Sequence, residues 1–202
     1  MHSDMTSPLF IVLEGPDGAG TTKHSVILEE RLKSEGFTVL RTFEPTDGPI
    51  GAQIRADLRA GNLSDPEAIQ RRFCEDRAWH LQHVIEPALK NGTIVISDRY
   101  AASTITYGLA LGIDRAILEE MNAAFRKPDI QLFLLPPFAM LQERLARRES
   151  TDAFEKAEFQ KKVYAEYRRL AAEDPSIIVI DTSGELEVVA DIILKATKKN
   201  DE

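Results

Sequence analysis

The sequence LFIVLEGPDGAGTT, at residues 9–22, decides the fold. It opens with a short apolar run that stops at a glycine-rich turn, the pattern of a strand buried on both faces of a parallel sheet. Residues 22–35 then carry apolar side chains near helical spacing, and Gly36 stands where a glycine commonly ends a helix. The stretch therefore predicts a strand, a loop and a helix in direct succession.

Further apolar runs along the chain predict a sheet. Four more strands are expected, at residues 38–43, 93–97, 130–135 and 177–180. The longest expected helices are residues 66–90, 115–126, 138–148, 154–173 and 186–198. Pro87 should end or kink the first of them, because proline lacks the N–H that an inner helical turn needs. Strands that alternate with helices predict an α/β fold.

Length and composition favour one domain. The chain has 202 residues, of which 43% are hydrophobic, enough for a well-buried core. Neither an internal repeat nor a Pro/Gly/Ser-rich linker divides it. We expect residues 9–202 to form a single domain behind a polar N-terminal extension at residues 1–8.

Charge and cysteine content exclude several classes of partner. A formal net charge of −8 argues against nucleic-acid polymers, because phosphate neutralisation needs clustered Lys and Arg. Cys74 is the only cysteine, so the chain has no internal disulfide and no Cys-rich metal site, which fits a reducing cytoplasm. Residues 1–8 lack the apolar run that is typical of a signal peptide, and no segment reaches the roughly 18 apolar residues that a membrane span needs. We therefore expect a soluble cytoplasmic protein without a membrane partner.

The segment GPDGAGTT, at residues 15–22, nearly matches the phosphate-binding pattern G-x-x-x-x-G-K-[ST]. Its outer glycines let backbone N–H groups turn toward phosphate oxygens, and the helix that follows points its positive end at the same place. Thr22 occupies the position of the Mg²⁺ ligand. The predicted ATP-binding residues are Gly15, Asp17, Gly18, Ala19, Gly20, Thr21 and Thr22.

The lysine of this pattern is missing, because Thr21 occupies its position. Lys23 is a poor substitute, since two helical residues turn a side chain by about 200° away from the loop. Taken alone, the loop could also be an ordinary connection between a strand and a helix.

Asp98 and Arg99 follow the strand predicted at residues 93–97. They therefore lie at a carboxyl strand end, where open α/β sheets bind ligands. A carboxylate there can hold Mg²⁺, and a guanidinium can grip a phosphate with two parallel hydrogen bonds. The alternative is a surface ion pair at the start of the next helix.

Four segments together resemble the successive motifs of thymidylate kinases, in that family's order: FIVLEGPDGAG, FEPTDGPIGAQIR, RRFCEDRAWH and SDRYAASTITYG. The resemblance spans most of the chain. It implies a P-loop kinase three-layer fold with a five-stranded parallel sheet flanked by helices. It also implies a homodimer that transfers the γ-phosphoryl group of ATP to dTMP with Mg²⁺ held near Thr22 and Asp98.

The resemblance assigns further residues to the acceptor. Asp17 would approach the deoxyribose, and Glu44, Pro45 and Arg55 would lie on the acceptor side, with Arg55 close to the phosphate. Arg99 would hold that phosphate.

Phe73 and Arg77 match the positions that stack on thymine and hydrogen-bond its carbonyl edge. They are four residues apart and share one helix face, as the residues of any amphipathic helix do. Tyr100, Ser103 and Tyr107 continue the match, whereas Gly108 replaces the family's glutamine and has no side chain to contact a base.

Arg147 and Arg148 stand where the family's lid begins, and the lid expected near residues 147–155 is short. Either arginine could supply the charge that Thr21 lacks, although solvated arginines at a helix end are an equally good interpretation.

Three functions remain open from the sequence. An active thymidylate kinase is favoured, because a scaffold needs only its core and would have no need for Thr22, Asp98 and Arg99 together. The alternatives are a nucleotide-binding homologue with little or no kinase activity, owing to Thr21, and a kinase for another nucleoside or nucleotide.

Overall fold

The computed structural model describes residues 8–61, 65–147 and 157–198. Five parallel strands form one sheet in the order β2-β3-β1-β4-β5. The strands are β1 (Phe10–Glu14), β2 (Val39–Phe43), β3 (Ile94–Asp98), β4 (Ile130–Leu134) and β5 (Ile178–Ile180). Each agrees with its predicted range to within one residue at either end. The α/β fold with a five-stranded parallel sheet is confirmed.

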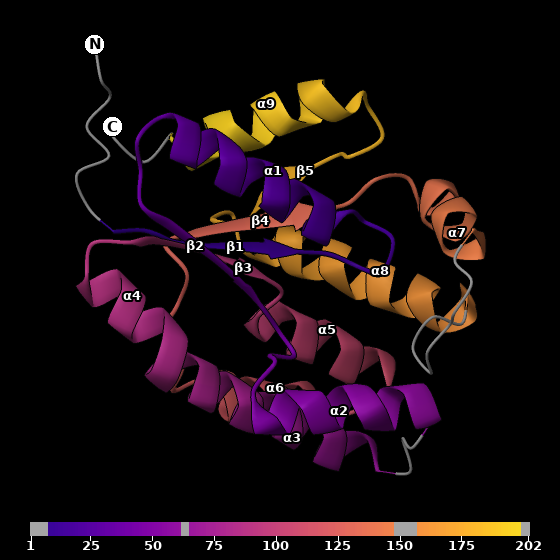
Figure 1. Ribbon diagram of the computed structural model, residues 1–202. Coiled ribbons are helices and arrows are strands. Elements are labelled where there is room, and N and C mark those ends of the chain that lie inside the picture. Colours follow the sequence, from indigo (N-terminus) through magenta and orange to yellow (C-terminus); the bar gives the residue numbers. More distant parts are fainter. Residues whose placement is uncertain (1–7, 62–64, 148–156, 199–202) are drawn as a thin grey trace.

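Helices cover both faces of this sheet. They are α1 (Thr21–Ser34), α2 (Pro49–Ala60), α3 (Pro66–His80), η1 (Leu81–Ile85), α4 (Glu86–Lys90), α5 (Ala101–Ala110), α6 (Arg115–Asn122), α7 (Phe138–Ala146), α8 (Ala157–Glu173) and α9 (Leu186–Thr197). In Figure 1, α1 and α9 lie on one side of the sheet, and α3 to α6 lie on the other. Helix α8 packs against α5 on this second side.

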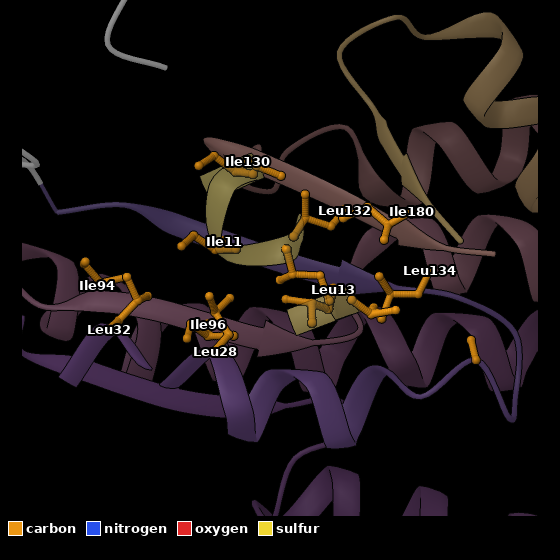
Figure 2. Close-up of a cluster of buried hydrophobic side chains, with 14 of the residues drawn as sticks. Ile11, Leu13, Leu28, Leu32, Ile94, Ile96, Ile130, Leu132, Leu134 and Ile180 are labelled. Carbon is orange, nitrogen blue, oxygen red and sulfur yellow. The ribbon is translucent and has the colours of Figure 1, made fainter. Parts of the chain in front are cut away.

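Strand β1 is buried along its whole length because alternate residues face the two helical layers. Ile11 and Leu13 belong to the core shared with Leu28 of α1 and with α9 (Figure 2). Phe10 and Val12 face the other side, where they pack with η1 and α4. A strand with apolar residues on both faces is what the run at residues 9–14 predicted.

The helix expected at residues 66–90 consists of three segments, α3, η1 and α4. The middle segment is a π-helix, and Pro87 lies in the first turn of α4, where its missing N–H is tolerated. The helix therefore widens into a π-helical turn just before Pro87, and the helical path continues through Pro87 into α4. Helices α2 and α5 were not among the predicted helices.

The carboxyl ends of β1, β2 and β3 lie side by side. The strand register aligns Leu13 of β1 and Phe43 of β2 with Asp98 of β3. The loops that leave these strands therefore begin at the same edge of the sheet, where α/β proteins bind ligands. Among the described helices, none has the length and apolar character that a membrane span requires.

Candidate active site

The phosphate loop, residues 15–22, connects β1 to α1. Gly18 and Gly20 have φ angles of 86° and 92°, a left-handed backbone that glycine adopts without strain. Gly20 is also the N-cap of α1, and its carbonyl accepts the N–H of His24 at 3.0 Å. The loop thus turns directly into a helix N-terminus, which is the arrangement that backbone binding of phosphate requires.

Thr21 is the first residue of α1, and its side chain is buried. Its methyl carbon Cγ2 lies 3.5 Å from the point where a Cβ on Gly15 would stand, so the position packs against the start of the loop. Lys23 is exposed. Thr21 therefore has a packing role inside the loop, at the position where a lysine would bring a charge.

Thr22 and Asp98 meet at the edge of the sheet. The Thr22 hydroxyl donates to Oδ2 of Asp98 at 2.5 Å. The other carboxylate oxygen, Oδ1, is buried and has no hydrogen-bond partner in the described part of the chain. A buried carboxylate oxygen without a partner beside a threonine hydroxyl suits a hard cation such as Mg²⁺.

Arg99 connects the β3 end to the phosphate loop. Its φ angle of 73° is unusual for a residue with a side chain, and such conformations cluster at functional sites. Nη1 donates to the carbonyl of Gly15 at 2.7 Å and to Ser103 Oγ at 3.2 Å. Nη2 pairs with Asp17 Oδ1 at 2.5 Å. The strained backbone therefore places the guanidinium against the loop.

Asp17 is also held from α8, by a residue that the sequence did not suggest. Gln160 donates through Nε2 to Asp17 Oδ2 at 2.7 Å and accepts the Asp17 N–H at 3.1 Å. The Asp17 carboxylate is thus shared between Arg99 and Gln160.

Glu14 organises the turn that carries Arg99. The sequence indicated Glu14 as the end of a strand and as part of the phosphate-loop motif, but it did not indicate this role. Its Oε1 accepts the N–H groups of Tyr100 and Ser103 at 2.8 and 3.2 Å. Its Oε2 accepts the Ser103 hydroxyl at 2.6 Å and the Tyr167 hydroxyl at 3.0 Å. Burial raises the pKa of Glu14, and the Ser103 hydrogen bond and the charge of Arg99 counteract part of that rise.

A pocket with about 580 Å³ of empty volume opens beside the phosphate loop. It is lined by Asp17, Glu44, Pro45, Leu58, Gln70, Phe73, Arg77, Arg99, Tyr100, Ser103, Thr104 and Tyr107. The structure therefore brings together every residue predicted for the acceptor except Arg55. Leu58, Gln70 and Thr104 were not predicted, since they lie outside the motifs or between motif positions.

Arg77 lies in the wall of this pocket and is 1% exposed. Its Nε and Nη2 donate to Glu44 Oε2 at 3.0 and 2.8 Å, in an ion pair that is buried on both sides. Nη2 also donates to Thr104 Oγ1 at 2.9 Å, and Nη1 donates to Asn122 Oδ1 at 2.5 Å. The guanidinium also lies 4.9 Å from the centre of the Tyr100 ring. Arg77 is thus a buried, fully bonded residue.

Arg55 lies beside the pocket without lining it. Its guanidinium donates to the carbonyl of Pro45 at 2.6 Å and to that of Thr46, and it pairs with Asp47 at 2.8 Å. In this structure Arg55 therefore supports the segment after β2.

Arg144 on α7 is a second arginine that contacts the phosphate loop, after Arg99. Its Nη1 donates to the Gly18 carbonyl at 3.0 Å, and Nη2 donates to the Thr182 carbonyl at 2.8 Å. Thr182 in turn donates through its hydroxyl to the Ala19 carbonyl at 2.8 Å. The carbonyls of Gly18 and Ala19 in the loop are therefore fixed by hydrogen bonds from outside the loop. The sequence gave no signal for this, because Arg144 looked like one more charge on an amphipathic helix.

The predicted lid is only partly described. Arg147 is exposed and caps the C-terminus of α7. Arg148 and the remainder of the predicted lid lie outside the described residues. Within the described ranges, no three His, Cys, Asp or Glu side chains gather as a metal site. A cation at Thr22 and Asp98 would therefore take its remaining ligands from water or substrate, as Mg²⁺ commonly does.

Comparisons with known proteins show which sequences this chain resembles. Residues 13–193 match the family model described as thymidylate kinase. The probable thymidylate kinase of Thermococcus kodakarensis is 36% identical over 195 residues, which cover 92% of this chain and 95% of the relative. The thymidylate kinase of Thermomicrobium roseum is 37% identical over 195 residues, 91% of each chain. That of Synechococcus sp. is 36% identical over 178 residues, 85% of this chain and 84% of the relative.

Proposed function

The chain belongs to the thymidylate kinase family, and we propose that it transfers the γ-phosphoryl group of ATP to dTMP, giving ADP and dTDP. The observation that carries this proposal is that the phosphate loop and the pocket share two residues. Asp17 and Arg99 belong to the phosphate loop and its contacts, and they also line the pocket. A nucleotide in the pocket and ATP on the loop would therefore meet at these two residues.

Phosphoryl transfer demands alignment and charge neutralisation more than covalent chemistry. The backbone N–H groups of residues 15–22 would hold the ATP phosphates. Arg99 would hold the acceptor phosphate, and Phe73 would stack on the base. Asp17, fixed by Gln160, would orient the deoxyribose.

Mg²⁺ would be held by Thr22 and Asp98, whose unpaired Oδ1 fits it. When bound, the ion neutralises negative charge on the ATP phosphates.

The missing lysine leaves the phosphate loop with one charge fewer. Arg99 and Arg144 donate to the Gly15 and Gly18 carbonyls, so two guanidinium groups already lie against the loop. They orient the peptide groups and add positive potential where the phosphates bind. Arg147 and Arg148 are the further candidates, because the lid is proposed to begin there.

Other features rest on the composition of the chain and, for the oligomeric state, on the family. We propose a single domain at residues 9–202, a homodimer, a cytoplasmic location, and no nucleic-acid or membrane partner.

A coupled assay of ADP formation with ATP, Mg²⁺ and each of dTMP, dCMP, AMP and GMP tests the function. We expect dTMP to be preferred, because Phe73 and Arg77, which match the family's thymine-reading positions, both line the pocket. Equal turnover of all four acceptors, or none with any, would contradict the proposal.

A further inference from the structure

Gln70 on α3 carries a buried amide that forms no hydrogen bond within the described part of the chain. The residue is 1% exposed. Both polar atoms of its side chain, Oε1 and Nε2, are buried and have no hydrogen-bond partner in the described part of the chain. Buried amides are nearly always bonded, because an unpaired one destabilises the folded state. Such an exception therefore calls for a physical reason.

Gln70 lies in the wall of the pocket, on the helix face that carries Phe73 and Arg77. The three residues are three and four positions apart along α3, so they follow one another on the same side. All three line the pocket, with Leu58 of α2 next to them. Gln70 therefore belongs to the part of the pocket wall that is proposed to face the base.

The charged groups on this side of the pocket are already engaged. Arg77 donates from Nε, Nη1 and Nη2 to Glu44, Asn122 and Thr104. Glu44 accepts from Arg77 with Oε2, and its Oε1 lies 3.0 Å from Nδ1 of His80. By contrast, neither the acceptor Oε1 nor the donor Nε2 of Gln70 has a hydrogen-bond partner among residues 8–61, 65–147 and 157–198.

From this contrast we propose that Gln70 binds the hydrogen-bonding edge of the acceptor's pyrimidine base. Oε1 would accept the N3–H of thymine, and Nε2 would donate to a neighbouring carbonyl of the ring. A planar amide matches an edge with adjacent donor and acceptor, which is how Gln and Asn read bases elsewhere. The inference rests on the proposed function, since it takes dTMP as the occupant of the pocket.

The unbonded amide would then destabilise the folded protein when the pocket is empty, and its hydrogen bonds to the base would offset that destabilisation in the complex. This makes an unusual forecast for Gln70→Met, which keeps the length of the side chain and removes its polar atoms. The free protein should become more stable, with the melting temperature raised by about 2–4 °C. At the same time Kd for dTMP should rise by about 5- to 30-fold. Gln70→Leu serves as a second variant if the Met protein folds poorly.

Thr197→Val is the matched control. Thr197 is also 1% exposed, but its hydroxyl donates to the Leu194 carbonyl at 2.8 Å, far along the chain in α9. This variant should lose stability and leave Kd for dTMP unchanged, the opposite of Gln70→Met on both counts.

The measurements are calorimetric Kd values for dTMP and for ATP, the melting temperature, and kcat. We expect Gln70→Met to change Kd for dTMP while Kd for ATP and kcat stay within about twofold, since a base contact contributes equally before and during transfer. A thermodynamic cycle that combines Gln70→Met with N3-methylated dTMP isolates the contact. Methylation of N3 should weaken dTMP binding less in Gln70→Met than in the parent. If the effects of the substitution and of the methylation on binding free energy are additive, the inference is wrong.

Two failures can be told apart. A parent protein that binds no dTMP overturns the proposed function, and this inference with it. A parent that binds dTMP with the same Kd as Gln70→Met overturns the inference alone.

Discussion

Replacing Arg144 by alanine tests how the phosphate loop works without its lysine. Arg144 is half-buried and donates to the Gly18 carbonyl at 3.0 Å and to the Thr182 carbonyl at 2.8 Å. Only the first bond acts on the loop directly. The second acts through the Thr182 hydroxyl, which holds the Ala19 carbonyl at 2.8 Å. Arg144→Ala should therefore loosen the loop and remove a nearby charge.

The size of the effect follows from the direct bond. A hydrogen bond to a charged group contributes about 1.5–3 kcal/mol, and solvent screening at a half-buried site reduces it toward the lower end. About 1.4 kcal/mol corresponds to a tenfold change, so we expect KM for ATP to rise by about 10- to 30-fold. KM for dTMP should change by less than about threefold, since Arg144 does not line the acceptor pocket.

The assay is dTDP formation at varied Mg²⁺-ATP with saturating dTMP. Arg147→Ala is the control, because it removes the same charge one turn later, at an exposed position on the same helix. A KM for ATP in Arg144→Ala that equals the KM of the parent would refute the role of the Gly18 contact. A larger effect of Arg147→Ala would instead support the lid arginine as the source of the missing charge.

Three further perturbations test the site. Arg99→Ala should lower turnover by about 10²–10³-fold and weaken dTMP binding more than ATP binding, as calorimetry with each nucleotide would measure; a greater loss of ATP binding would reverse the assignment. Thr21→Lys should change turnover by less than about tenfold, because other cations already lie against the loop and the buried threonine packs toward Gly15. A gain of about 100-fold would mean that the parent has no substitute for the lysine. Burial lowers the pKa of His24 below its ordinary value of 6.5, and the charges of Lys23 and Arg144 lower it further. Below pH 6.5 His24 therefore binds a proton more readily in the unfolded chain than in the folded chain, so the stability present above pH 6.5 is lost as pH falls. His24→Gln should flatten the decline in melting temperature below pH 6.5, and an unchanged slope would contradict this.

The strands and the phosphate loop could be predicted because their signals are local. The run at residues 9–14 is apolar on both faces, and a strand of that kind fits only between two helical layers. Gly18 and Gly20 adopt φ angles that few other residues tolerate, so their spacing in the sequence already specified the turn. The widened turn before Pro87 is a local feature too, but the choice between a kink, an end and a π-helix depends on what packs around it.

The sequence alone determined the order of elements and the chemistry available at each strand end, because periodicity, glycine spacing and motif order act over a few residues. Only the tertiary structure decided which groups meet. Gln160 reaches Asp17 across 143 residues, and Thr182 reaches Ala19 across 163. It also decided that Arg77 is fully bonded while Gln70, on the same helix face, has no partner among the described residues. A hydrogen bond depends on the distance and angle between two groups in space, and no local pattern in the chain encodes either.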